Sequence, residues 1–252
     1  MEPYLRFAVH LKGEGPLPLT YREGLQAALY SLLPPSLGKR VHNQGFPVDG
    51  RPLKLLVFSQ ILGLRFNENR SFHPDTHIRF LFASPVPEIS KELSQAIQKR
   101  GEILLYGKAF PVLWIEPLPL PKVTQLLEVR TLSPITAYRT EGGKTRYFGP
   151  YFGPHEAEFS QLLEGNLNRK ARALGLSPGR LEVWTSPGPK RRLVQYKGFW
   201  IEGWEGNFLL KGDAHLLRLA LLAGLGPKGS QGFGYILERE RQTVRVRGEP
   251  PR

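Results

Sequence analysis

Alternation of apolar and polar residues near the start of the chain predicts a β-strand with one buried face. Within Tyr4–Leu11, every second residue from Leu5 to Leu11 is apolar, and the residues between them form the other face. Such a period of two is typical of a half-buried strand. His10 lies on the second face, where we expect a surface or cross-strand residue.

A helical period replaces this alternation after Thr20 and ends before the two prolines that begin at Pro34. Thr20 and Glu23 have the spacing of a capping box, in which a hydroxyl and a carboxylate bond the free N–H groups of the first turn. Apolar residues at helical spacing predict the buried stripe. One further face of this helix is expected to carry three polar residues spaced i, i+4 and i+8, namely Arg22, Gln26 and Tyr30.

The remainder of the first half predicts three more strand segments and a second helix. Strand patterns cover residues 53–64, 76–85 and 102–116, and a helical pattern covers residues 87–100. The polar segments 36–49 and 65–75 are expected to be connections. The resulting order, β-α-β-β-α-β, is that of a ferredoxin-like unit.

The same order recurs in the second half. Strand patterns cover residues 126–136, 181–185, 193–210 and 233–239, and helical patterns cover 156–174 and 213–223, with Asp213 as the N-cap of the last helix. We therefore expect an α+β fold of two tandem ferredoxin-like (β-α-β-β-α-β) domains. Their expected bounds are residues 1–117 and 122–252, with a proline-rich linker between them.

Glycines are concentrated in the stretch Gly224–Tyr235, GLGPKGSQGFGY, which follows the last helix and precedes the last strand. Dinucleotide-binding loops and P-loops have the opposite order, strand before helix. Glycine permits positive φ and close backbone approach, and exposed N–H groups bind anions. The alternative is a flexible turn that caps the helix. The anion-binding interpretation selects Gly226, Lys228, Gly229, Ser230, Gln231 and Gly232.

The charge of the chain favours a polyanionic partner. Lysine and arginine total 35 against 22 acidic residues, which gives a net charge of +13 and a pI near 10.1. No basic amphipathic helix or membrane-spanning apolar run is present in the sequence, so nucleic acid is favoured over membrane; the alternative is charge for solubility alone. Candidate RNA-contacting residues lie in three basic segments: Arg139, Lys144 and Arg146; Arg169 and Arg172; and Lys190, Arg191 and Arg192.

Cysteine is absent, which excludes disulfides, thiolate zinc sites and a cysteine nucleophile. The N-terminal residues lack the pattern of a signal peptide, so we expect a cytoplasmic protein. Trp184, Trp200 and Trp204 are expected in the core or on strand faces rather than as platforms for RNA bases.

Histidine is the side chain best suited to exchange protons near neutral pH. His42 lies in the basic segment after the first helix, away from any apolar stripe, and is the preferred candidate for acid–base chemistry. The segment His73-Pro-Asp75-Thr-His77 has ligand types but lacks a clear third ligand, so no metal or other cofactor is predicted. These three residues are expected to lie in a loop or face RNA.

The glycine stretch between the last helix and the last strand resembles the signature of the RAMP superfamily, and in particular of CRISPR-associated endoribonucleases that cut repeat RNA into guide RNAs. The resemblance implies tandem ferredoxin-like domains and catalytic residues near the first helix. It matches His42 and Tyr30 by position, leaves the lysine open between Lys39 and Lys54, and makes Arg22 an alternative cation.

The expected reaction is metal-independent cleavage of CRISPR repeat RNA, with 2′-OH attack giving a 2′,3′-cyclic phosphate and a 5′-OH. The expected substrate is a stem-loop, and a homodimer and membership of a CRISPR effector complex stay open. The alternative from another class is a non-catalytic RAMP subunit that binds guide RNA. A general RNA-recognition module is disfavoured because its aromatic strand signature is absent.

Overall fold

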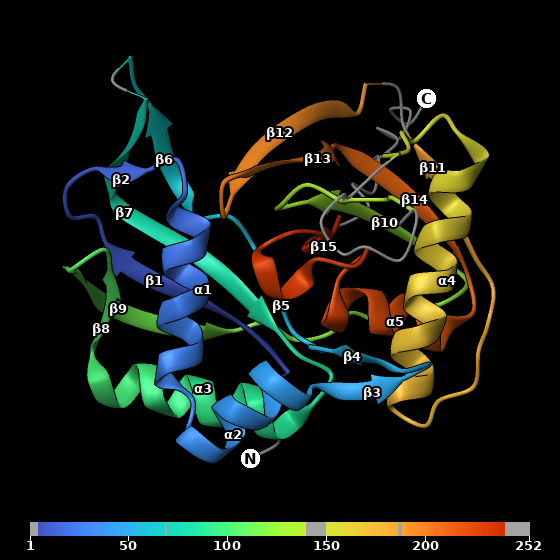
Figure 1. The fold of residues 1–252 in the computed structure, drawn as a ribbon, viewed down its shortest axis with the longest axis horizontal. Coiled ribbons are helices and arrows are strands. Elements are labelled where there is room, and N and C mark those ends of the chain that lie inside the picture. The colour runs from blue at the N-terminus through green and yellow to red at the C-terminus, as the bar shows by residue number, and fades with distance from the viewer. Residues whose placement is uncertain (1–4, 69, 140–149, 186–187, 240–252) are drawn as a thin grey trace, which may run out of the picture.

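The structure is a computed structural model that describes residues 5–68, 70–139, 150–185 and 188–239. Its elements gather around two main sheets, one from each half of the chain (Figure 1). Among these residues, no helix is both long and apolar enough to cross a membrane.

The N-terminal sheet has the order β2-β7-β1-β9-β8, and β5 and β6 also pair with β7. The strand pairs of this sheet are antiparallel. Its strands are β1 (Arg6–Lys12), β2 (Leu17–Pro18), β5 (Val57–Phe58), β6 (Leu62–Phe66), β7 (Ser71–Ala83), β8 (Glu102–Leu105) and β9 (Lys108–Pro117). The helices of this half are α1 (Tyr21–Leu32), α2 (Pro35–Lys39), the π-helix η1 (Arg40–Gln44) and α3 (Pro87–Arg100), and a small sheet joins β3 (Phe46–Val48) to β4 (Arg51–Leu53).

The C-terminal sheet has the order β11-β14-β10-β15, again with antiparallel pairs. Its strands are β10 (Leu126–Thr131), β11 (Leu181–Thr185), β14 (Asn207–Gly212) and β15 (Ile236–Glu238). The helices are α4 (Ala157–Ala173), α5 (Ala214–Ala223) and the 3₁₀ turn η2 (Gly229–Gln231). A separate hairpin joins β12 (Lys190–Tyr196) to β13 (Phe199–Glu205).

Each sheet covers its own apolar core. Phe7, Val9 and Leu11 of β1 are fully buried in the N-terminal core, as the alternating pattern predicts. The expectation of a half-buried strand is wrong, because the face that carries Ala8 and His10 is buried as well. Val129 of β10, Leu163 of α4 and several residues of α5 contribute to the C-terminal core. The mixed α/β character expected from the sequence is confirmed.

A third cluster of buried residues joins the two halves. It contains Ala8 and Leu81 from the N-terminal sheet with Leu132 and Tyr235 from the C-terminal half. Beside it, the buried guanidinium of Arg6 donates two hydrogen bonds to the Glu238 carboxylate, at 2.8 and 2.7 Å. Because these contacts connect the first strand to the last, the two halves share one interface.

Several sequence expectations about local structure are wrong. Residues 65–75 are not a connection, because parts of β6 and β7 pair there, and residues 36–49 contain α2, η1 and β3 rather than a loop. The segment 193–210 contains three strands, since the chain turns at the tight β12–β13 connection and again before β14.

The two expected N-caps also differ from the structure. Thr20 and Asp213 occupy N-cap positions, but neither side chain caps its helix. The Thr20 hydroxyl instead accepts a hydrogen bond from Tyr106 at 3.0 Å, and Asp213 accepts one from the Arg180 N–H at 2.8 Å. Glu23, the expected partner of Thr20, accepts from the Lys197 N–H.

Candidate active site at the end of helix α1

Tyr30, His42 and Lys54 come together from three separate segments of the N-terminal half. The rings of Tyr30 in α1 and His42 in η1 meet edge to face, with centroids 5.4 Å apart and planes at 89°. The Lys54 Nζ, just after β4, donates a hydrogen bond to the His42 carbonyl oxygen. Three of the five catalytic candidates from the sequence are therefore neighbours.

The chain between α1 and β5 folds so that these residues meet. Leu37 and Val41 bury their side chains in the N-terminal core and hold α2 and η1 against α1. Gly45 then takes a positive φ of 59°, and its N–H closes the π-helix on the Arg40 carbonyl at 2.8 Å. The β3–β4 hairpin returns the chain, which brings Lys54 back to His42.

Burial sets the protonation of two of these groups. It raises the pKa of Tyr30 to about 12, so the phenol keeps its proton at neutral pH. Burial also lowers the pKa of Lys54. His42 is exposed, and its Nδ1 lies 2.7 Å from the Asn43 Oδ1. With that amide oxygen as acceptor, Nδ1 carries the proton and Nε2 is left to accept one.

The glycine stretch reaches this cluster through Ser230. The Ser230 side chain hydrogen-bonds the Tyr30 hydroxyl, and its carbonyl accepts a hydrogen bond from Gln26 Nε2 at 2.6 Å. The Gln26 Oε1 accepts a further bond from the Tyr196 hydroxyl in β12. The face of α1 that the spacing of Arg22, Gln26 and Tyr30 predicted is thus the face that meets the C-terminal half.

Most of the glycine stretch is buried, which corrects the expectation of an exposed, flexible loop. Gly226, Gly229, Gly232 and Lys228 are buried; Ser230 and Gln231 are half-buried. The segment packs against β5 and α1. Burial lowers the pKa of Lys228 to about 8, and its Nζ lies 5.1 Å from the centroid of the Tyr138 ring.

Close backbone packing explains why glycine recurs here. A Cβ at Gly226 would lie 2.4 Å from the Thr136 carbonyl oxygen, and one at Gly234 would lie 1.9 Å from the Leu225 oxygen. Both residues also have positive φ, at 85° and 73°. Side chains are therefore excluded by neighbouring backbone as well as by conformation.

Lys170 of α4 fastens the start of this stretch. Its buried Nζ donates to the carbonyl oxygens of Ala223, Gly224 and Gly226 at 2.9, 2.8 and 3.0 Å. Burial lowers the pKa of Lys170 to about 7, while the three carbonyl acceptors favour its ammonium form. Sequence reasoning placed Lys170 on this helix but missed its role, because the acceptors lie more than 50 residues away.

The other two cationic candidates do not join the cluster. Lys39 is exposed at the end of α2, and its ammonium forms no hydrogen bond or ion pair with a described residue. Arg22 is buried near the start of α1, eight residues before Tyr30, which is about 12 Å along a helix. Its NH2 group donates to Gln60 Oε1 at 3.1 Å.

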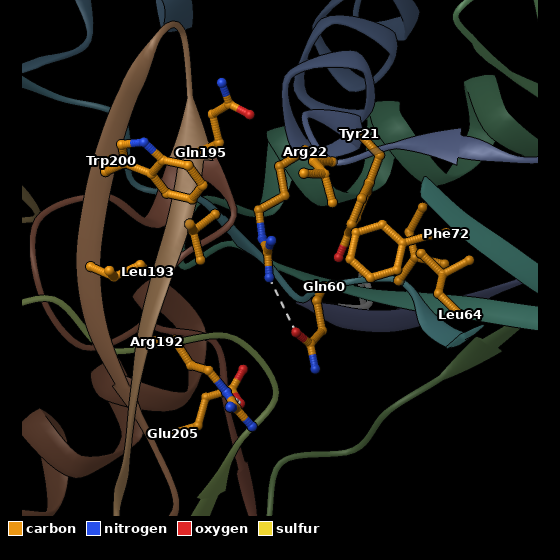
Figure 2. A pocket seen from close by; sticks show the side chains of 13 residues that line it. Tyr21, Arg22, Gln60, Leu64, Phe72, Arg192, Leu193, Gln195, Trp200 and Glu205 are labelled. Carbon is orange, nitrogen blue, oxygen red and sulfur yellow. Dashed lines mark hydrogen bonds and ion pairs between the residues drawn. The ribbon is translucent and has the colours of Figure 1, made fainter. Parts of the chain in front are cut away.

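Two clefts border the elements that carry the cluster. One, of about 330 Å³, lies between α1 and the β12–β13 hairpin, with Arg22 and Gln60 in its wall (Figure 2). The other, of about 470 Å³, is lined by Leu53, the neighbour of Lys54, and by Arg139 and Arg169.

The remaining basic candidates differ in whether their charged groups form ion pairs. Arg172 pairs with Asp49 of the β3–β4 turn, and Arg191 and Arg192 pair with Glu202 and Glu205 inside their own hairpin. Lys190 is exposed and begins β12, which therefore starts before residue 193, where the sequence pattern placed the start of a strand. Lys144 and Arg146 lie outside the described residues.

The histidine segment of β7 is arranged as a strand rather than a loop. Asp75 pairs with Arg65 at 2.9 Å, and His77 Nε2 lies 2.8 Å from His10 Nδ1. His10 is a buried cross-strand residue, stacked against Trp114. Among the described residues, no group of three or more histidine, cysteine or acidic side chains is arranged to hold a metal ion.

Comparison with known proteins supports a resemblance to one family. Residues 118–237 match the family model described as CRISPR associated protein Cas6, C-terminal. The chain resembles Cas6 proteins over this region, which is slightly less than half of its length. It is 30% identical, over 170 residues, to a CRISPR-associated endoribonuclease Cas6 of Pyrococcus furiosus, and this match covers 66% of the chain and 62% of that relative's length. The resemblance to CRISPR repeat-RNA-processing proteins of the RAMP superfamily is thus confirmed.

Two further Cas6 proteins cover more of the chain. A CRISPR-associated endoribonuclease Cas6 1 of Methanocaldococcus jannaschii is 25% identical over 236 residues, which is 89% of the chain and 88% of that relative. A solved structure of a Cas6-related gene product from Pyrococcus furiosus superposes with a TM-score of 0.80 at 20% identity, over 94% of this chain and 99% of that one. This last likeness concerns the fold.

The glycine packing predicts a stability difference between two substitutions. Gly234→Ala should destabilise the protein by about 1–3 kcal/mol more than Gly107→Ala, because only Gly234 has backbone in the space of a Cβ. Gly107 is a matched control, since its φ of 77° is close to the 73° of Gly234. Denaturant unfolding of both variants measures the difference, and equal midpoints would contradict the packing argument.

Proposed function

We propose that this protein is an endoribonuclease that cuts CRISPR repeat RNA without a metal ion. The observation that carries the proposal is the meeting of Tyr30, His42 and Lys54, which brings a proton acceptor, a proton donor and a cation together around an exposed imidazole. The net charge of +13 fits a polyanionic substrate, and two relatives are named endoribonucleases.

The reaction needs two proton transfers and no added water. The 2′-oxygen of the ribose forms a bond to the adjacent phosphorus, and His42 Nε2 takes the 2′-OH proton. The bond from phosphorus to the 5′-oxygen breaks, and the Tyr30 hydroxyl, which keeps its proton because of its raised pKa, donates toward the leaving oxygen. The products are a 2′,3′-cyclic phosphate and a 5′-OH.

Lys54 supplies the positive charge in this proposal. Its bond to the His42 backbone carbonyl holds the ammonium at the residue that carries the imidazole, and a cation there would stabilise the negative charge that develops on the phosphate oxygens. Lys39 makes no such bond to the described residues of the cluster, so we assign the role to Lys54.

We also propose that the two halves are tandem ferredoxin-like domains, residues 1–117 and 122–252. The support is the strand order. With β6, β7, β1 and β9 in the first sheet and β11, β14, β10 and β15 in the second, both sheets have the order 2-3-1-4 of a β-α-β-β-α-β unit. The β12–β13 hairpin is then an insertion in the second domain.

The RNA is proposed to run past the cluster between the two clefts. Arg139 and Arg169 in the cleft next to Leu53 are suited to phosphate contacts, because neither forms an ion pair with another described residue. In the glycine stretch, Ser230 and Gln231 are the polar side chains with exposed surface. We propose a stem-loop substrate and a cytoplasmic location, and leave a homodimer and an effector complex open.

Replacing the imidazole tests the chemistry directly. His42→Ala should lower the single-turnover cleavage rate of repeat RNA by about 10²–10⁴-fold in excess EDTA, because an acid–base group is lost. RNA binding should stay nearly unchanged, since His42 contributes no fixed charge to it. The matched control is His155→Ala, another exposed histidine, which should cut at the wild-type rate. Loss of wild-type cutting in EDTA, or equal loss of binding and cutting in His42→Ala, contradicts the proposal.

The raised pKa of Tyr30 predicts how its contribution depends on pH. Tyr30→Phe should lower the cleavage rate by about 10²-fold or more, and the ratio of wild-type to variant rate should stay constant from about pH 6 to about pH 10. The reason is that a phenol with a pKa near 12 stays protonated throughout that range. Rate measurements at several pH values check this. A ratio that falls toward one as the pH passes about 9–10 would indicate a tyrosine with the ordinary phenol pKa.

A further inference from the structure

The cleft between α1 and the β12–β13 hairpin has the chemistry of a binding site that the proposed reaction does not use. Its volume of about 330 Å³ is within the range of small-molecule pockets. Buried Tyr21 and the neighbouring Phe72, which meet edge to face at 5.4 Å, form an apolar floor. The walls carry both polar and apolar side chains, and the two sides come from different halves of the chain (Figure 2).

Arg22 is a buried cation without a charged partner in this wall. Its side chain is 6% exposed, and none of the described carboxylates forms an ion pair with it. The guanidinium lies 5.2 Å from the Tyr21 ring centroid and 5.9 Å from that of Phe233, and its Nε has no hydrogen-bond partner. A buried charge is costly unless it is paired, so this position is suited to an anion.

Gln60 and Trp200 provide groups that recognise a nucleobase. Gln60 uses its Oε1 to accept from Arg22, and none of the described residues accepts from its Nε2, which leaves two donors at the cleft. Trp200 is 55% exposed on β13, and Figure 2 shows its ring directed across the cleft toward Arg22. Amide donors read acceptor edges such as N7 and O6 of guanine, and aromatic rings stack on unpaired bases.

The cleft is linked to the candidate active site along α1. Arg22, Gln26 and Tyr30 share one face of the helix, and Gln26 is hydrogen-bonded to both Ser230 and Tyr196 between the two sites. Because the C-terminal half covers this face, an RNA strand would follow the edge of the contact between the halves, and Arg22 and Tyr30 are about 12 Å apart along the helix.

We propose that this cleft holds one unstacked nucleotide of the RNA that flanks the cut, with its base against Trp200 and Gln60 and its phosphate on Arg22. The proposal rests on the proposed function, because it takes RNA as the substrate. The nucleotide in the cleft presents an acceptor edge, as guanine does with N7 and O6, and it makes the site selective for sequence near the cut.

The test combines an RNA that lacks one base with a protein variant that lacks the Trp200 ring. Equilibrium binding is measured with repeat RNA that carries a single abasic nucleotide, moved one position at a time past the cut, and a 2′-deoxy group at the mapped cut to prevent cleavage. If the wild-type protein does not cut the repeat RNA, the same series of abasic RNAs is measured without the 2′-deoxy group. At one position, the abasic change should weaken wild-type binding by about ten-fold, the scale of one base–aromatic stack.

Trp200→Ala should weaken binding of the intact RNA by a similar factor, and it should bind the intact and the abasic RNA equally. Trp184→Ala is the matched control, because Trp184 is 56% exposed on β11 but does not line the cleft. This control should keep the full sensitivity to the abasic position. In addition, Arg22→Gln should reduce the slope of log affinity against log salt by about one, as loss of one phosphate contact requires.

The outcomes separate the two proposals. If repeat RNA is cut but Trp200→Ala stays as sensitive as Trp184→Ala at every abasic position, the nucleotide site is wrong and the nuclease proposal stands. If Trp200→Ala alone loses the sensitivity to the abasic position but no RNA is cut, the nuclease proposal is wrong and the nucleotide site stands. Absence of RNA binding by the wild-type protein overturns both.

Discussion

Close contact between backbone segments at the glycine stretch is the constraint on which the rest of the structure depends. Gly226 and Gly234 leave no space for a Cβ, and Lys170 holds the start of the stretch through three carbonyl oxygens. Because the stretch packs against β5 and α1, these contacts fix the C-terminal half on the N-terminal half. The stretch is therefore first a structural joint between the two halves, and Ser230 and Gln231 are its polar side chains with exposed surface.

This joint completes the candidate active site. Tyr30, His42 and Lys54 come from the N-terminal half, but Tyr30 hydrogen-bonds Ser230, and Gln26 is held by Ser230 and Tyr196. The orientation of the phenol thus depends on residues about 200 positions away in the chain. A substitution that loosens the glycine packing is expected to act on catalysis through Tyr30 rather than through His42, whose neighbours are local.

Features with local causes could be predicted from the sequence. The face shared by Arg22, Gln26 and Tyr30 follows from helical spacing, and the burial of Phe7, Val9 and Leu11 follows from alternation. The resemblance to repeat-RNA nucleases paired His42 with Tyr30, and the ring contact agrees with that pairing. The choice of Lys54 over Lys39 needed the structure, because the β3–β4 hairpin that returns the chain has no strong sequence pattern.

Features with distant causes could not be predicted. The predicted capping box does not form, because the side-chain oxygens of Thr20 and Glu23 accept hydrogen bonds from Tyr106 and Lys197 instead. The glycine stretch was expected to be exposed because its packing partners in β5 and α1 lie far away in the sequence. Likewise, Trp184 and Trp200 are on strand faces, as expected, but more than half exposed, since the pattern of a hairpin strand does not say which side another element covers.

The most direct test of the account is a structure of the protein with repeat RNA that has a 2′-deoxy nucleotide at the cut. The account predicts that the phosphate at the cut lies within hydrogen-bond distance of His42 Nε2, Lys54 Nζ and the Tyr30 hydroxyl, with the RNA following the edge of the contact between the halves. A phosphate held elsewhere, with the His42 imidazole in solvent, would contradict it.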